Sequence, residues 1–293
     1  MIGALNGVRV LDFGRYISGP FSGMLLADMG ADVIKVEKAG GDIDRTLRPF
    51  TKEGKSMYVS TFARNKRCIT VNFRSDAGKE LLKKLVSKCD VLINNYRPGV
   101  MEKMGIGYED AKLLNPGIIY ASISGFGQGG AYWERAAFDG IATAMSGVMS
   151  CNWGSNGPRG LGTPIADVTT GYVNALAILT ALYHREKTGC GQFIDTAMVD
   201  AISPFLETLL PTYFLTGVAD ETMKRNGGDP TSAPANTFRA KDGYFYMHAG
   251  TNPHFTKLLG LINIPEIKQA LCDERFQDHT NRKNSAPEVE DLV

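Results

Sequence analysis

Residues 7–38 read GVRVLDFGRYISGPFSGMLLADMGADVIKVEK and decide the fold of the chain. Residues 8–13 have the apolar composition of a buried strand, and residues 32–37 predict a second strand. The intervening segment 20–29 predicts a helix, with Gly30 at its C-terminal end. Two strands joined through one helix predict a βαβ unit, in which the strands run parallel.

The same alternation continues along the chain. Residues 68–73, 90–94 and 117–123 have strand patterns, while residues 75–87 and 141–149 have helical periodicity. This order predicts an α/β fold, a Rossmann-like and mostly parallel sheet with flanking helices. Ligands should therefore gather beyond the carboxyl ends of the strands.

A further helix, the clearest element in the sequence, follows a loop rich in glycine and proline. Thr163 and Pro164 match the preferred N-cap and N1 positions. Apolar residues then recur at steps of three and four residues: Val168, Tyr172, Ala175, Leu176, Leu179 and Leu182. From about residue 218 the sequence becomes polar and leads into a strand pattern at 244–249. We expect a large domain at 1–217 and a partial α+β domain at 218–293.

Composition excludes several classes of function. The 293 residues carry 32 Lys and Arg against 31 Asp and Glu, so no overall charge favours nucleic acid, and a small ligand held by a local basic cluster is expected. The five scattered cysteines and four histidines form no metal-binding pattern and no catalytic triad. The absence of a signal peptide pattern and of an uninterrupted apolar run predicts a cytoplasmic protein that is not bound to a membrane.

Asp167 is the first candidate for chemistry. It falls in the first turn of the helix that starts near residue 163, where unpaired backbone N–H groups stabilise a negative charge. A carboxylate kept ionised beside a flexible loop is available as a nucleophile. From position alone, an acid that only supports its helix is the commoner case.

The run Gly125-Phe126-Gly127-Gln128-Gly129-Gly130 satisfies the G-x-G-x-x-G pattern of dinucleotide-binding loops. A true fingerprint opens directly into an apolar helix, but AYWERAAFD follows here. We therefore favour a glycine-rich loop that lets the backbone approach a ligand or another segment.

Five blocks together resemble the class III (CaiB/BaiF-type, formyl-CoA transferase-like) coenzyme A transferases. They are residues 7–45, 65–73, 89–130, 138–147 and 163–201, and their joint order and spacing are specific. The resemblance implies that Asp167, in the pattern P-x-A-D-x-x-x-G, is the catalytic carboxylate. It implies transfer of CoA from an acyl-CoA donor to a carboxylic acid acceptor through an aspartyl anhydride and an aspartyl-CoA thioester.

The resemblance also implies a CoA site and a quaternary structure. Gly227 and Gly228 are similar to a mobile loop that covers the active site, and Ala136 stands where some relatives carry a lysine. CoA and acyl-CoA are substrates, no metal or permanently bound cofactor is implied, and the full-length protein is expected to form an interlocked homodimer. The residues implied to hold CoA or to lie beside the nucleophile are Ile17, Ser18, Lys38, Val71, Arg74, Asn95, Tyr96, Lys103, Phe138 and Asp139.

Two alternatives stay open at this point. Racemases of 2-methylacyl-CoA share the fold and need a second acid or base, a histidine in the block that here reads Ala137-Phe138-Asp139. Phe138 at that place favours the transferase. Because family members continue past the point where this chain stops, we expect a C-terminally truncated second domain, and a CoA-binding remnant without activity is the third interpretation.

Overall fold

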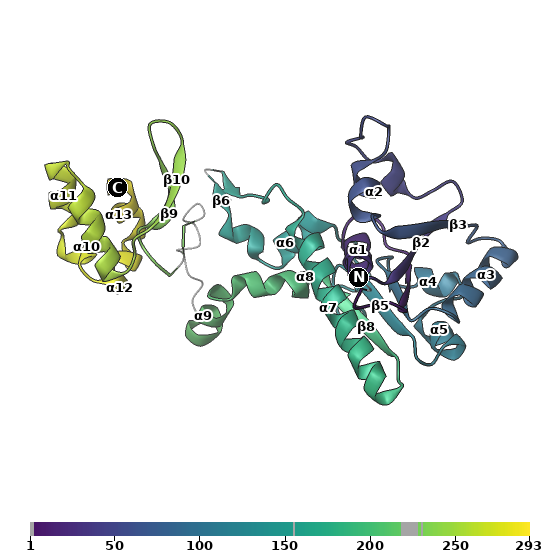
Figure 1. Ribbon diagram of the computed structural model, residues 1–293. Helices are drawn as coiled ribbons and strands as arrows, with labels where there is room; N and C mark the ends of the chain where they lie inside the picture. Colours follow the sequence, from purple (N-terminus) through teal and green to yellow (C-terminus); the bar gives the residue numbers. More distant parts are fainter. Residues whose placement is uncertain (1–2, 155, 218–227, 230) are drawn as a thin grey trace. The chain divides into compact units, whose positions relative to one another are not determined.

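The computed structural model describes residues 3–154, 156–217, 228–229 and 231–293 (Figure 1). The chain divides into two compact units. The first comprises Met1–Ser146 and Thr163–Ile202, and the second comprises Gly147–Gly162 and Ser203–Val293. The domain boundary expected between residues 217 and 218 stays a prediction.

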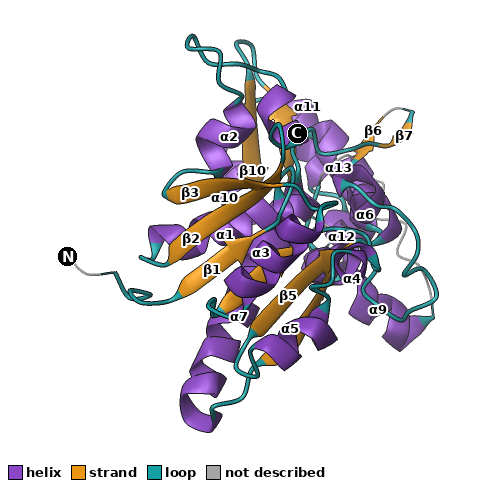
Figure 2. Ribbon diagram, turned by 90° about the vertical axis from the view of Figure 1, so that its right-hand side faces the viewer, coloured by secondary structure: helices purple, strands orange, loops and turns teal. Residues whose placement is uncertain are grey.

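A six-stranded parallel sheet forms the centre of the first unit, with the strand order β3-β2-β1-β4-β5-β8. Figure 2 shows β3, β2 and β1 as neighbouring arrows. The strand order reverses between β1 and β4, which is where parallel sheets of this type open a crevice for ligands. The predicted fold class is confirmed. The strands are β1 Arg9–Asp12, β2 Asp32–Lys38, β3 Lys66–Val71, β4 Val91–Asn94, β5 Ile119–Ser124 and β8 Gln192–Ala197.

Helices cover both faces of this sheet because successive strand residues point to opposite sides. Val10 of β1 packs in a core cluster with α1 Ser18–Asp28 and α7 Ile165–Thr188. The next residue, Leu11, packs in a second cluster on the other face, with α3 Asp76–Val86, α4 Val100–Lys103 and α5 Tyr108–Leu114. The two layers fix the loops at the strand ends.

Helix α7 is the longest helix that the structure describes, at 24 residues. Its length and hydropathy meet the criteria for a membrane span, although core helices of soluble proteins pass the same test. One side of α7 packs on α1 and the sheet, where Ile178, Ala181 and Leu182 are buried. The expected helix start is one residue early, since Pro164 is the N-cap and Ile165 the first helical residue.

Other elements of the first unit differ from the sequence patterns. The helix expected at 141–149 is α6 Asp139–Met145, and Gly147 in a left-handed conformation separates it from the 3-10 helix η2 Val148–Cys151. Strand β8 has no predicted counterpart and pairs with β5. The remaining elements of this unit are the 3-10 helix η1 Ile43–Thr46 and the helices α2 Met57–Phe62 and α8 Met198–Ile202.

The second unit contains a hairpin of β9 Ala235–Arg239 and β10 Tyr244–His248, which includes the strand expected at 244–249. Its core gathers Phe255, Leu271 and Phe276 beside the buried Arg282, whose guanidinium donates to the Phe276 carbonyl at 2.7 Å. The other elements are β6 Trp153–Gly154, β7 Gly157–Pro158, η3 Ser203–Leu206, α9 Leu209–Thr216, α10 Asn252–Leu261, α11 Pro265–Leu271, η5 Glu274–Phe276, α12 His279–Asn284 and α13 Ala286–Leu292.

Candidate active site

Asp167 lies in the first turn of α7 and lines a cavity of about 250 Å³. Its backbone N–H donates to Asp139 Oδ1 at 3.1 Å, which ties the start of α7 to the start of α6. The cavity walls come from the segments that follow β1, β4, β5 and β8, as expected for the carboxyl edge of a parallel sheet. The lining residues are Arg15, Tyr16, Ser18, Asn95, Tyr96, Arg97, Pro98, Ile123, Ser124, Gly125, Trp133, Arg135, Ala136, Ala137, Phe138, Asp167 and Met198.

The Asp167 carboxyl has an unusual proton affinity. Burial, reinforced by the negative charge of Asp139, raises its pKa to about 6, against hydrogen bonds from the Ser18 hydroxyl and N–H that lower it. The position of Asp167 at a helix start favours the ionised carboxylate, but burial and Asp139 favour the protonated form. With a pKa of about 6, about nine-tenths of the carboxyl is still ionised at pH 7.

Ser18 reaches Asp167 because α1 and α7 approach each other closely. Ser18 is the first residue of α1, so its N–H belongs to the unpaired, positive end of that helix. Gly171 lies one turn after Asp167, and a Cβ there would stand 2.7 Å from Phe21 Cδ1 and 3.0 Å from the Ser18 carbonyl oxygen. A side chain at position 171 would therefore push the start of α1 away from the carboxylate.

The loop between β1 and α1 is clamped by Asn95. Its side chain accepts the Arg15 N–H at 2.8 Å and donates to the Arg15 carbonyl at 2.8 Å and to Ser18 Oγ at 3.2 Å. Tyr16 has a positive φ of 60°, a conformation that costs a non-glycine residue about 1–2 kcal/mol. Such strain persists only where neighbouring groups over-determine the backbone, and it concentrates at functional sites.

Aromatic rings line the cavity beside this loop. Tyr16 and Phe138 meet edge to face, with ring centroids 5.7 Å apart. The Arg15 guanidinium lies 4.4 Å from the centroid of the Tyr96 ring. Burial raises the pKa of Tyr96 to about 12, so its phenol stays neutral at physiological pH. These rings give the cavity apolar walls next to the Asp167 carboxylate.

A second pocket, of about 620 Å³, collects basic residues from the end of β2 and from the segments after β3 and β4, and we call it the cationic pocket. Lys38, Arg74 and Lys103 line it together with Arg15, which also lines the Asp167 cavity. Within the described part of the chain, Lys38, Arg74 and Lys103 form no ion pair with a carboxylate. Three uncompensated cations beside the cavity are suited to bind phosphate groups.

Most of the predicted site residues come together at this edge of the sheet. Ser18, Asn95, Tyr96 and Phe138 line the Asp167 cavity, and Asp139 contacts the Asp167 backbone. Lys38, Arg74 and Lys103 line the cationic pocket. Each of these roles stays a prediction.

Two predicted CoA contacts, Ile17 and Val71, are not among the residues that line either pocket. Ile17 and Val71 are buried, and Val71 packs in the core cluster that contains Leu11. Gly227 lies outside the described residues, and Gly228 belongs to the second unit.

Several residues of the cavity wall were not predicted from the sequence, notably Arg15, Tyr16 and Arg135. Arg15 and Tyr16 could have been found, because they directly follow the first predicted strand of a parallel sheet. The glycine-rich run behaves as expected. A methyl group on Gly125 would overlap Ala137 Cβ, so glycine allows residues 125 and 137 to approach each other.

Comparison with known proteins identifies the family, since residues 5–293 match the model of CoA-transferase family III. The chain belongs to this family. It is 37% identical over 293 residues to the succinyl-CoA--D-citramalate CoA-transferase of Chloroflexus aurantiacus, covering 99% of this chain and 71% of that enzyme. It is also 39% identical to the succinyl-CoA:glutarate CoA-transferase of Mus musculus, covering 90% of this chain and 60% of that enzyme.

Solved structures support the same assignment. A CaiB/BaiF family protein from Brucella suis matches with a TM-score of 0.81 and 36% identity, covering 100% of this chain and 78% of that protein. The family resemblance drawn from the sequence blocks is thus confirmed, and family membership makes the chain a transferase.

Proposed function

We propose that this family III chain transfers CoA between carboxylic acids through the Asp167 carboxylate as a covalent nucleophile. The observation that carries the proposal is the placement of this carboxylate. It lines a cavity beside the cationic pocket, and it accepts hydrogen bonds from Ser18 at the start of α1. A nucleophile oriented by fixed donors, next to a site for the anionic part of its substrate, fits covalent catalysis.

The proposed chemistry has four steps. An Asp167 oxygen attacks the thioester carbonyl of the donor and expels CoA thiolate, which leaves a mixed anhydride. The thiolate attacks the aspartyl carbonyl and expels the donor acid, which leaves an aspartyl-CoA thioester. The acceptor carboxylate then displaces the thiolate to form a new anhydride. Finally, the thiolate attacks the acceptor's acyl carbon and regenerates the free carboxylate.

We infer that acyl-CoA extends from the cationic pocket into the Asp167 cavity. Lys38, Arg74 and Lys103 would bind its phosphates, and Arg15, which lines both pockets, marks the passage between them. Asn95 and Tyr96 would border the pantetheine arm near the cavity. Each attack produces a tetrahedral oxyanion, which backbone N–H groups around the cavity would stabilise.

The named relatives suggest which acids to test first. The enzymes from Chloroflexus aurantiacus and Mus musculus both carry succinyl-CoA in their names. We therefore propose succinyl-CoA as the donor and a second dicarboxylic acid as the acceptor. Phe138 occupies the place of the racemase histidine, and no histidine lines the cavity among the described residues, so no observation favours racemisation.

The test is to trap the proposed intermediate. The protein is incubated with succinyl-CoA and hydroxylamine, and its peptides are analysed by mass spectrometry, with Asp167→Ala as the matched control. We expect a hydroxamate at Asp167, loss of turnover in Asp167→Ala, and CoA affinity within a few-fold of wild type, because the side chain acts on the acyl carbon. Turnover without modification of Asp167, or an adduct on another carboxylate, would refute the proposal.

Further expectations from the resemblance remain proposals. We propose a homodimer in the cytoplasm, a large CoA-binding and catalytic domain at residues 1–217, and a second domain from residue 218. CoA and acyl-CoA enter this scheme as substrates, with no permanently bound cofactor.

A further inference from the structure

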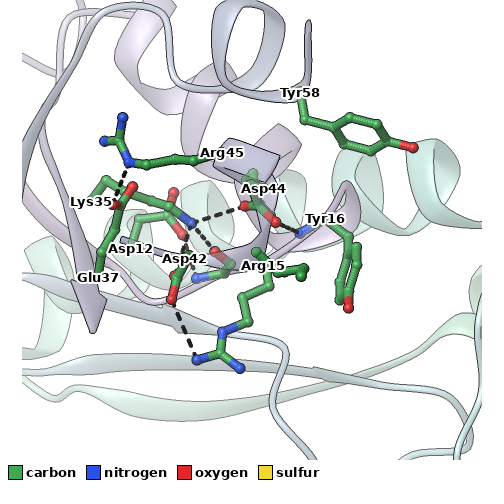
Figure 3. A network of polar contacts seen from close by, with 12 residues as sticks. Asp12, Arg15, Tyr16, Lys35, Glu37, Asp42, Asp44, Arg45 and Tyr58 are labelled. Atoms are coloured by element: carbon green, nitrogen blue, oxygen red, sulfur yellow. Dashed lines mark hydrogen bonds and ion pairs between the residues drawn. The ribbon is translucent and has the colours of Figure 1, made fainter. Parts of the chain in front are cut away.

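A cluster of buried charges lies behind the loop that leads from β1 into α1 (Figure 3). Lys35 of β2 and Asp42 and Asp44 beyond that strand are only 3%, 2% and 4% exposed. Lys35 Nζ lies 3.4 Å from Asp44 Oδ2 and 3.8 Å from Asp42 Oδ2. Buried ion pairs add little stability compared with apolar packing, so the cluster calls for another explanation.

The cluster holds the loop at three consecutive residues. The Lys35 ammonium donates to the Gly14 carbonyl, and Asp42 Oδ1 pairs with the Arg15 guanidinium at 3.4 Å. Asp44 Oδ1 accepts the Tyr16 N–H at 2.8 Å, so one carboxylate binds both the loop and Lys35.

Of these three contacts, the hydrogen bond from the Tyr16 N–H to Asp44 bears most directly on the active site. Tyr16 is the loop residue with the strained, left-handed backbone, and its N–H is fixed by Asp44. Ser18 follows two residues later and places its hydroxyl and N–H on the Asp167 carboxylate. Asn95, which follows β4, hydrogen-bonds to the same loop, so residues from both strands next to β1 hold the segment between β1 and Ser18.

We propose that Asp44 and Lys35 are positioning residues of the active site, which hold the backbone of residues 14–16 so that Ser18 presents both donors to Asp167. Neither residue lines the Asp167 cavity, so they act through the loop. The inference rests on the proposed function for its catalytic meaning. The geometry from Asp44 through Tyr16 to Ser18 is independent of which acids are exchanged.

Loss of the hydrogen bond between Asp44 and the Tyr16 N–H should shift the pKa of Asp167 in a predictable direction. Releasing Tyr16 weakens the two hydrogen bonds from Ser18, which stabilise the ionised carboxylate, so the pKa of Asp167 rises. Removing the negative charge of Asp44 by itself would lower that pKa. Asp139 of α6 acts on the charge of Asp167, and the charged residues that line the cavity with it are Arg15, Arg97 and Arg135. The Asp44 variants leave all four in place.

The test is a direct titration of Asp167 that needs no substrate. Protein labelled with ¹³C at aspartate carboxyls is titrated by NMR, and the Asp167 signal is assigned with Asp167→Asn. Wild type should titrate at about 6. In Asp44→Ala we expect the midpoint to rise by about one pH unit, the size expected when hydrogen bonds to a carboxylate are weakened. Asp44→Asn, which keeps an acceptor for the Tyr16 N–H, should fall between the two.

The matched control is Glu37→Gln. Glu37 is a buried carboxylate of the same strand as Lys35, and it accepts a hydrogen bond from Arg45 Nε at 2.7 Å, as Figure 3 also shows. In the part of the chain that the structure describes, neither Glu37 nor Arg45 hydrogen-bonds to residues 14–18. This control removes the charge of a buried carboxylate without touching the loop, so the midpoint of Asp167 should stay at its wild-type value.

A double variant tests the route through Ser18. Ser18→Ala alone should raise the midpoint, and adding Asp44→Ala to it should produce less than the sum of the two single effects, because both act on one set of hydrogen bonds. The inference is wrong if folded Asp44→Ala and Asp44→Asn both titrate like wild type, or if the two effects add fully. If Asp44→Ala does not fold, Asp44→Asn decides alone.

The same samples separate this inference from the proposed function. Missing hydroxylamine adducts at Asp167 in wild type, with the titration pattern as expected, would refute the covalent mechanism and leave the positioning role intact. Adducts at Asp167 together with unchanged midpoints would leave the mechanism intact and refute the positioning role.

Discussion

Replacement of Gly171 by alanine should impair the active site while the chain still folds. In Gly171→Ala the new Cβ would stand 2.7 Å from Phe21 Cδ1 and 3.0 Å from the Ser18 carbonyl oxygen. Overpacking of this kind costs about 1–3 kcal/mol. Replacing glycine by alanine within a helix returns about 1 kcal/mol. The free energy of unfolding should therefore fall by about 0–2 kcal/mol.

The same clash should also lower the rate of catalysis. The clash is relieved by moving the start of α1 away from α7 by some tenths of an ångström, and this movement lengthens the hydrogen bonds from Ser18 to Asp167. Because a misplacement of about 1 Å can cost about a hundredfold in rate, we expect kcat to fall about tenfold. The pKa of Asp167, and with it the acid limb of the pH profile, should move upward from about 6.

The assay measures kcat with succinyl-CoA across pH 5–8, together with the thermal midpoint of unfolding. Gly140→Ala in α6 is the control, because a Cβ at Gly140 meets no atom within 4 Å, and its kcat should stay within twofold of wild type. The reasoning fails if Gly171→Ala keeps wild-type kcat and the wild-type acid limb. Equal losses in both variants would also contradict it.

Three further outcomes follow from the same geometry. Turnover should fall as pH drops through about 6, because the nucleophile is the ionised form of Asp167, and a rate that is flat down to pH 5 would contradict this. Asp167→Asn should melt at a higher temperature than wild type at pH 7.5, and the difference should shrink as pH falls from 6 to 4. The reason is that folding raises the pKa of the Asp167 carboxyl from 3.8 to about 6, so its ionisation destabilises the fold as pH rises through that window. Calorimetry at several pH values checks the sign. Lys38→Ala and Arg74→Ala should each raise KM for acyl-CoA about tenfold with little change in kcat, whereas replacement of the exposed Lys84 of α3 by alanine should leave both unchanged. A salt titration of KM measures the electrostatic share.

The sequence predicts those parts of the fold that depend on local patterns. The βαβ unit at 7–38 has strands of apolar residues around a helix closed by Gly30, and the structure places β1, α1 and β2 there. Strand β8 has no such signal, because its segment QFIDTA mixes polar and apolar residues and contains no long run of β-branched ones. Its pairing with β5 depends on the whole sheet.

The candidate site also has parts that the sequence predicts and parts that depend on the tertiary structure. Asp167 is a candidate from its helix start, which is a local pattern, and the resemblance to CoA transferases adds its catalytic role and Ser18. The conformation of Tyr16 cannot be predicted from such patterns, because the groups that fix it come from Asn95 and Asp44, which are distant in sequence. The helix position of Asp167 predicts an ionised carboxylate, and only the tertiary structure shows the burial and the neighbouring Asp139 that raise its pKa.

The contact between Asp139 and the start of α7 has a consequence for the resting protein. Free Asp167 places a second negative charge near Asp139, and that repulsion is present whenever no acyl group is attached. Once the proposed anhydride or thioester forms, the aspartyl group is neutral and the repulsion disappears. The empty protein is thus the electrostatically strained member of the cycle, and acylated chains should resist heat better than unmodified ones.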